Sequence, residues 1–158
     1  MFNRLLLVHL CVLLVVAFAV PGFAQKRPAK PPDETAKVAT LVKGSKLKAH
    51  LVSRNIWMIE PEGGSIIVVA EADIFIVFTV LARASDFKPT AETFAAMLRY
   101  AGEADFVKIA LDDNGDLVLR IEATTRSVVQ KDFNAIVEQV IAASGEAARK
   151  LQPFLVKN

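Results

Sequence analysis

The chain has 158 residues, 19 basic and 17 acidic side chains, and a single cysteine, Cys11. A chain of this length corresponds to one domain. The lone cysteine excludes an internal disulfide, and because His9 and His50 are the only histidines, a zinc site made of several His and Cys ligands is excluded too. We expect neither a metal nor a cofactor.

The first 24 residues predict a secretory signal peptide. Arg4 precedes an apolar run over residues 5–20, and a Pro21-Gly22 break leads to the small residue Ala24. A retained membrane anchor is the alternative, but the sixteen residues of the run span only about 24 Å as a helix, less than the roughly 30 Å of a hydrocarbon core. We therefore expect export, with cleavage after Ala24 and a periplasmic or secreted product.

Residues 25–33 predict a Pro/Lys-rich linker that leads into a domain over residues 34–158. Basic charge is concentrated here, since residues 25–54 hold eight basic and two acidic side chains, while residues 55–158 hold ten and fifteen. This pattern is typical of a solvated linker, or of a segment that contacts an anionic membrane or wall polymer. The candidate residues for that contact are Lys26, Arg27, Lys30, Lys43, Lys46 and Lys48. Nucleic acid is disfavoured, because the folded part has no basic face with interleaved aromatic residues.

The first half of the domain predicts a short helix followed by strands. Val38, Leu41 and Val42 share a helical spacing, and Gly44 ends or weakens that helix. Residues 46–58 fit either a strand or a continuing helix. Residues 56–83 are rich in β-branched and aromatic side chains and predict three strands, which are interrupted by turn residues.

The second half predicts a helix, two strands and a long helix. A helix opens at Pro89 and Thr90, strands follow over residues 106–111 and 117–123, and the long helix ends at Pro153. One continuous apolar face on that helix is formed by Phe133, Ile136, Val137, Val140, Ile141, Ser144, Ala148 and Leu151. The sequence therefore predicts an α+β fold in the order α-β-β-β-α-β-β-α, with an antiparallel sheet of about five strands and helices packed on one face.

The acidic stretch KIALDDNGDLVLRIE, residues 108–122, predicts a turn and not a calcium loop. With Asp112 as position 1 of an EF-hand loop, Leu117 would occupy the glycine position and Ala123 the glutamate position. A three-residue turn over residues 113–115 pairs Leu111 with Leu117 and brings the apolar faces of both strands together. It requires glycine in the left-handed conformation, which Gly115 supplies.

The strand over residues 74–81, IFIVFTVL, is apolar on both faces. A sheet with helices on one side leaves its second face in water, so one apolar face of this strand should be covered by something else. We predict that Phe75, Val77 and Leu81 form the partner-binding face. The cover is the N-terminal segment of the same chain, a second subunit in a homodimer, or a client peptide.

No catalytic group emerges from the sequence. His50 is the only histidine after the predicted leader, and the chain lacks the G-x-S-x-G pattern of serine hydrolases. We therefore expect no enzymatic activity.

Residues 97–140, MLRYAGEADFVKIALDDNGDLVLRIEATTRSVVQKDFNAIVEQV, resemble a known family. A helix, an acidic glycine-containing hairpin and a phenylalanine-led helix follow one another here, as in the bacterial sensory transduction regulator family, within the type III secretion chaperone-like fold. The resemblance implies a non-enzymatic, often dimeric module that binds protein. A surface-attached adaptor that binds anionic lipid or wall polymer through the basic N-terminal segment is the alternative function.

Overall fold

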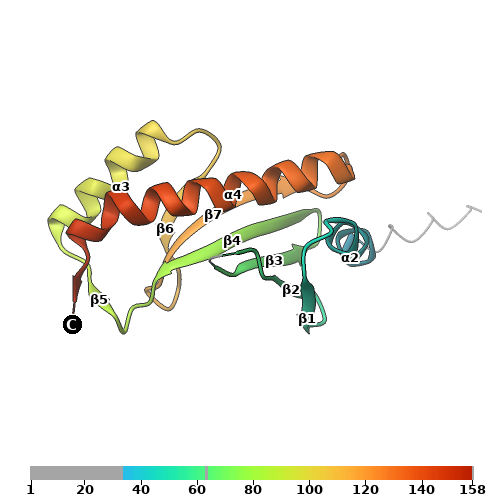
Figure 1. Ribbon diagram of the computed structural model, residues 1–158, viewed down its shortest axis with the longest axis horizontal. Coiled ribbons are helices and arrows are strands. Elements are labelled where there is room, and N and C mark those ends of the chain that lie inside the picture. Colours follow the sequence, from blue (N-terminus) through green and yellow to red (C-terminus); the bar gives the residue numbers. More distant parts are fainter. Residues whose placement is uncertain (1–33, 63, 158) are drawn as a thin grey trace, which may run out of the picture. The chain divides into compact units, whose positions relative to one another are not determined.

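The computed structural model describes residues 34–62 and 64–157 (Figure 1). The predicted signal peptide and linker lie outside the described residues, and so do Lys26, Arg27 and Lys30. None of the described helices is both long and apolar enough to span a membrane.

The described part is an α+β domain, as the sequence predicts. Its elements are α2 (Glu34–Gly44), β1 (Ala49–Ser53), β2 (Ile56–Ile59), β3 (Ile66–Glu71), β4 (Ile74–Ala82), β5 (Phe87–Lys88), α3 (Ala91–Glu103), β6 (Lys108–Leu111), β7 (Leu117–Thr124), α4 (Gln130–Leu151) and β8 (Val156–Lys157), with a 3-10 turn at Gln152–Phe154 before β8. Six strands form one antiparallel sheet in the order β1-β2-β3-β4-β7-β6, and β5 pairs with β8. The sheet thus has one strand more than the predicted five, because the segment that fits either a strand or a continuing helix contains β1.

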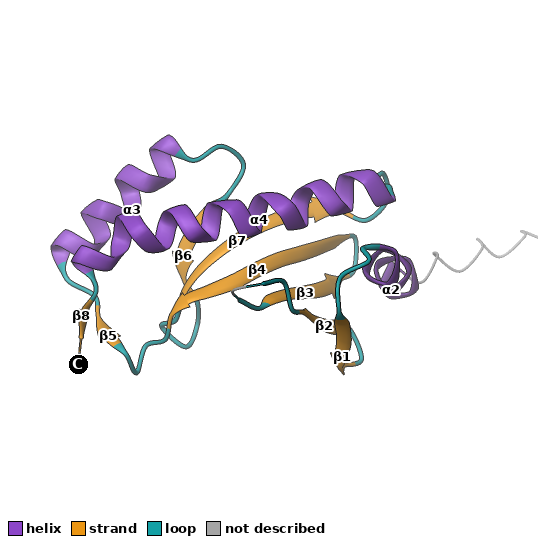
Figure 2. Ribbon diagram, viewed as in Figure 1, coloured by secondary structure: helices purple, strands orange, loops and turns teal. Residues whose placement is uncertain are grey.

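The helices form a layer on one face of the six-stranded sheet (Figure 2). The apolar stripe of α4 packs across β4 and β7, and its buried members are Phe133, Val137, Val140, Ala147 and Leu151. At fully buried positions, each large apolar side chain contributes about 1.5–3 kcal/mol relative to an exposed one. The long helix therefore fixes which face of the sheet becomes the core.

Polar contacts hold α2 against the start of α4. The Lys37 ammonium donates to the backbone carbonyl of Thr125, and to that of Arg126 at 2.9 Å. The Gln130 side-chain amide donates to the Leu41 carbonyl at 2.9 Å. These bonds pair backbone carbonyls of α2 and of the β7–α4 connection with side-chain donors from the facing segment. They hold α2 beside β3, at the end of the core.

The β6–β7 hairpin has the predicted register. Leu111 pairs with Leu117 and Ile109 with Leu119, and the Asp112 N–H donates to the Asp116 carbonyl at 2.9 Å. Gly115 adopts a φ of 81°, the left-handed conformation that the three-residue turn requires.

Candidate protein-binding face

The residues predicted to bind a partner lie toward the helices instead. Phe75 and Val77 are fully buried, and the Phe75 ring packs on Phe133 of α4 with 5.7 Å between ring centroids. Leu81 is partly buried and packs against the same core. The prediction that this face of β4 is left uncovered is therefore wrong, because the apolar stripe of α4 docks on it.

The opposite face of the same strands carries the uncovered apolar side chains. Side chains alternate between the two faces of a strand, so the residues between the core positions point away from the helices. We name this surface the open sheet face, and its residues, all partly buried or exposed, are Ile56, Met58, Ile67, Val69, Ile74, Ile76, Phe78 and Val80. β4 is therefore apolar on both faces, as predicted. The face with Phe75 and Val77 is covered by α4, and the face with Ile76 and Phe78 is the one that no described helix covers.

Strand pairing joins these side chains into a continuous surface. Phe78 pairs with Ile67, which pairs in turn with Met58. Residues directly opposite one another in an antiparallel sheet have Cβ atoms about 4.5–5.5 Å apart, so each such row is in contact across three strands. A second, parallel row joins Ile76, Val69 and Ile56 in the same way.

Charges flank the apolar rows and are paired with one another. Toward the β6 edge, the Glu122 carboxylate accepts from Lys108 at 2.6 Å and lies 3.1 Å from the Arg120 guanidinium. The hydrogen bond from Lys108 lowers the pKa of Glu122. Toward the β1 edge, Lys48 and Glu60 form an ion pair at 2.7 Å, which lowers the pKa of Glu60. The centre of the open sheet face is left without charge.

A hollow of about 640 Å³ continues the open sheet face at the turn between β2 and β3. Met58, Ile67 and Val80 contribute to its lining, together with Gly145 and Ala148 of α4 and with the charged residues Glu62, Arg83 and Asp86. A hollow next to an apolar face offers a place for one large side chain of a bound segment.

Of the residues predicted to contact an anionic surface, Lys43, Lys46 and Lys48 lie in or next to the connection between α2 and β1. Lys43 and Arg54 line a groove of about 630 Å³ between α2 and β1, and its other lining residues include Leu47, Leu51 and Trp57. No acidic side chain lines this groove. Lys46, in the loop, adopts a φ of 62°, whereas Lys48 is held by Glu60.

No catalytic or metal-binding constellation is present among residues 34–62 and 64–157. The His50 imidazole is about half exposed, and its Nδ1 atom lies 3.9 Å from the Glu60 carboxylate. No group of three or more His, Cys, Asp or Glu side chains lies close enough to hold a metal ion within this described part. At the β6–β7 turn, the Asp112 carboxylate accepts from the N–H groups of Asn114 and Asp116 at 2.9 Å each, so it acts as a turn-forming side chain.

Comparison with known proteins identifies the fold. No family model and no curated protein sequence matches the chain. Among solved structures, YbjN from E. coli is 14% identical over 76% of this chain and 93% of that chain, with a TM-score of 0.59. The domain has the type III secretion chaperone-like fold.

Two chaperone complexes support the same assignment. A chain of the HopA1–SchA chaperone–effector complex is 9% identical, covers 73% of this chain and 95% of its own length, and has a TM-score of 0.56. A chain of the heterodimeric ExoU–SpcU complex from the type III secretion system of Pseudomonas aeruginosa is 18% identical with the same coverages and a TM-score of 0.52. The sequence resemblance to this fold, and to a sensory transduction regulator-like protein within it, is confirmed.

Proposed function

We propose that this domain is a non-enzymatic protein-binding module that holds an apolar segment of a client protein on the open sheet face. The observation that carries the proposal is the pair of apolar rows that cross three strands, over which none of the described helices packs. Apolar surface of this kind on a soluble domain marks an interaction site. Relatives in fold, such as SchA and SpcU, were solved in complexes with effector proteins, which supports protein as the ligand class.

The paired charges at both edges favour an apolar segment over a charged one. Glu122 and Glu60 already have cationic partners, so a client charge placed there would compete with an existing ion pair. A client side chain above Ile67, whose cross-strand neighbours are Met58 and Phe78, meets mainly hydrocarbon, which favours Leu, Ile, Val, Phe or Met. Phe78 itself lies opposite Arg120 of β7.

The predicted signal peptide indicates in which compartment the client would be bound. We infer that the mature protein acts outside the cytoplasm, because residues 1–24 have the features of a cleavable signal. Cell fractionation, together with N-terminal sequencing of the mature protein, tests this part. An unprocessed chain in the cytoplasm would contradict it without affecting the binding face.

Site-specific photo-crosslinking tests the binding face. We expect a photoreactive phenylalanine analogue at position 78 to form a discrete adduct with a client in cells. The matched control is the same analogue at Phe106, which is more exposed, at 83%, but lies outside the open sheet face. The position-78 adduct should disappear when Ile67→Asp places a charge directly opposite it on β3. Adducts of equal yield from positions 78 and 106, or no adduct at 78, would refute the proposal.

A second candidate function is adhesion to an anionic surface, and the groove between α2 and β1 favours it. Lys43 and Arg54 have no acidic neighbour among the lining residues, so their charge is available to an anionic lipid or wall polymer. We expect binding to vesicles that contain anionic lipid, weakened by added salt and by Lys43→Gln combined with Arg54→Gln. The control is Lys131→Gln, an exposed lysine on α4. Binding that resists high salt, or that is lost equally in the control, would argue against this function.

A further inference from the structure

The groove of about 630 Å³ between α2 and β1, which we name the α2–β1 groove, combines an apolar lining with two exposed basic side chains. Its volume is within the range of about 300–1,000 Å³ that is usual for small-molecule sites. The basic side chains are Lys43 and Arg54, and Thr35 is the only other polar side chain among the described lining residues. The apolar lining consists of Ala36, Ala39, Val42, Leu47, Ala49, Leu51 and Trp57.

Small side chains on both walls keep the α2–β1 groove open. Ala36 and Ala39 lie three residues apart, so they share one side of α2. Ala49 and Leu51 lie two residues apart, so they share one face of β1. An alanine side chain ends at Cβ, and the three alanines therefore leave space that larger apolar residues would fill.

The lining of the α2–β1 groove changes from exposed to buried with depth. Leu51 is 60% exposed and Leu47 is 38% exposed, whereas Trp57 is 7% exposed and Val42 is 2% exposed. A flat membrane surface can contact the two leucines. Only a slender ligand that enters the groove can reach the Trp57 indole, so the shape favours a single inserted chain over a surface.

The two basic side chains are available to a ligand. Within the described part of the chain, neither Lys43 nor Arg54 forms an ion pair or a side-chain hydrogen bond. Arg54 stands in the turn between β1 and β2, which is held by two hydrogen bonds of 2.9 Å between Asn55 and Ala70. Lys43 lies in the last turn of α2, where the helix dipole already attracts its charge. Arg54 is therefore the stronger anion contact, and its planar guanidinium can bind a carboxylate through two parallel hydrogen bonds.

We infer that the α2–β1 groove binds a long-chain fatty acid, with its acyl chain between Ala39 and Trp57 and its carboxylate on Arg54. Each methylene group that leaves water for apolar surroundings raises the affinity about fourfold. An acyl chain has no amide groups that need partners. A peptide in the same place would bury its amide groups against a lining in which Thr35 is the only neutral polar side chain, which weakens binding. Lining and charge together select a fatty acid over a peptide segment.

This inference rests on the basic groove of the second candidate function, and it replaces a membrane surface by a single fatty acid that enters the groove. Adhesion to a surface depends on charge alone, whereas an inserted chain also depends on its length. The two ideas can therefore be separated by a change in chain length at constant charge. The open sheet face takes no part in either.

Titration of the full chain with octanoate, decanoate and dodecanoate, each below its micelle concentration, tests the acyl-chain site. Trp57 is the only tryptophan in the chain, so its emission reports binding in the groove, and calorimetry gives the affinity. We expect the affinity to rise roughly tenfold for each pair of added carbons. Ala39→Phe, which fills the groove, should abolish binding. The matched control is Thr40→Phe, an exposed position of α2 outside the lining, which should leave binding unchanged.

A comparison of dodecanoate with dodecanol tests the head-group contact. We expect Arg54→Gln to weaken dodecanoate binding at least tenfold and Lys43→Gln to weaken it only a few-fold. Dodecanol carries no charge, so it should bind to wild type and to Arg54→Gln equally well. Ile67→Asp, on the open sheet face, should change neither affinity.

Three results would overturn the inference. They are an affinity that does not rise with chain length, dodecanoate binding that persists in Ala39→Phe, and an equal effect of Arg54→Gln on the acid and the alcohol. Salt-sensitive binding to anionic vesicles without binding of any fatty acid would overturn the inference and leave surface adhesion standing. Fatty-acid binding with the expected chain-length dependence but without vesicle binding would support the inference and remove adhesion.

Discussion

Truncation of two phenylalanines on β4 tests which face of the strand is the core. Phe75 and Phe78 lie three residues apart on the same strand but on opposite faces of the sheet. Phe75 is fully buried against Phe133, whereas Phe78 is only partly buried on the open sheet face. The same change, phenylalanine to alanine, should therefore have very different effects on the free energy of unfolding.

The expected magnitudes follow from burial. Phe75→Ala removes a ring from a closed core and leaves a cavity, which costs about 3–5 kcal/mol. Phe78→Ala removes a ring that already contacts water, and the lost burial is worth roughly 1 kcal/mol. For a domain of this size, the first change should lower Tm by more than about 10 °C and the second by only a few degrees.

Urea unfolding followed by tryptophan fluorescence measures both variants. Trp57 is the only tryptophan in the chain and is 7% exposed, so its emission should shift to longer wavelength on unfolding. All proteins are compared at one concentration, because dimer formation would add a concentration-dependent term to stability. Equal destabilisation by the two changes, or a cost below about 1.5 kcal/mol for Phe75→Ala, would refute the assignment of the core face.

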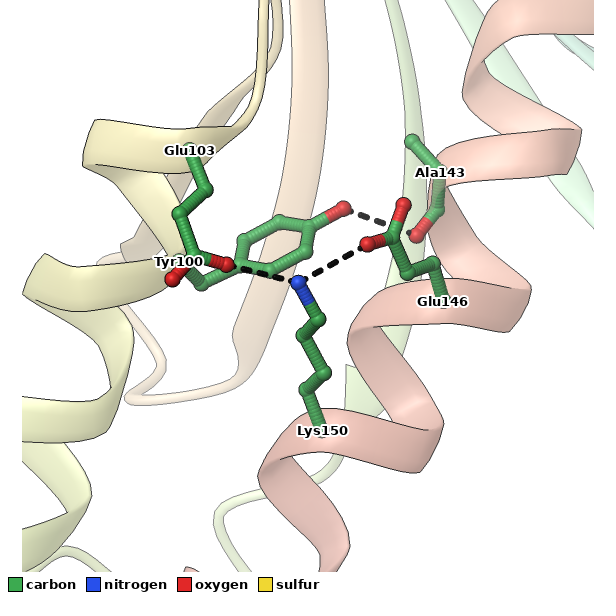
Figure 3. Close-up of polar contacts among 5 residues, drawn as sticks. All are labelled: Tyr100, Glu103, Ala143, Glu146 and Lys150. Atoms are coloured by element: carbon green, nitrogen blue, oxygen red, sulfur yellow. Dashed lines mark hydrogen bonds and ion pairs between the residues drawn. The ribbon is translucent and has the colours of Figure 1, made fainter.

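Three further predictions concern local contacts. The hydrogen bond from Lys150 lowers the pKa of Glu103 below its usual 4.5 (Figure 3), so the stability from this pair is present above about pH 4.5 and is lost as the pH falls through the lowered pKa. Thermal melts of Glu103→Gln should therefore differ from wild type at neutral pH, and the difference should shrink steadily as the pH is lowered below about 4.5. Gly44→Ala should cost about 1 kcal/mol, because the new Cβ would lie 2.2 Å from Gln130 and break its bond to α2, and should cost nothing further in urea unfolding once Gln130→Ala is present. Gly115→Ala should cost about 1–2 kcal/mol in the same assay, since alanine is strained at a φ of 81°, and no loss would mean that the turn relaxes.

The sequence predicts those elements whose signal is local. The start of α3 after Pro89 is confirmed, with Thr90 accepting a hydrogen bond from the Thr93 N–H as the N-terminal cap. The apolar stripe of α4 is confirmed at Phe133, Val137, Val140 and Leu151, whereas Ala147 is buried and Ala148 is exposed. The β6–β7 register is confirmed because both strands have one clearly apolar face and Gly115 selects the turn. Periodicity and turn chemistry act over a few residues, so they can be recognised without knowledge of the tertiary structure.

The core face of β4 depends on distant parts of the chain. Both faces hold large apolar side chains, so alternation alone cannot decide which face the helices cover. Thr79 gives a misleading signal, since its polar side chain suggests that its face is open to water. In the structure Thr79 lies on the core face, where its hydroxyl donates to the Ser65 carbonyl at 3.0 Å and needs no water. The docking of Phe133 on Phe75, 58 positions apart in sequence, decides the outcome.

Other elements lack a local signal for different reasons. The turn between β1 and β2 contains no glycine or proline, and Asn55 stabilises it by donating to the Ala70 carbonyl on β3 at 2.9 Å. β5 and β8 are two residues each and pair over a long sequence separation, which leaves no periodicity to detect. On α3, Met97 and Leu98 both fit an apolar helical pattern, yet only Met97 faces the core. Apolar spacing alone therefore does not identify the buried side of α3.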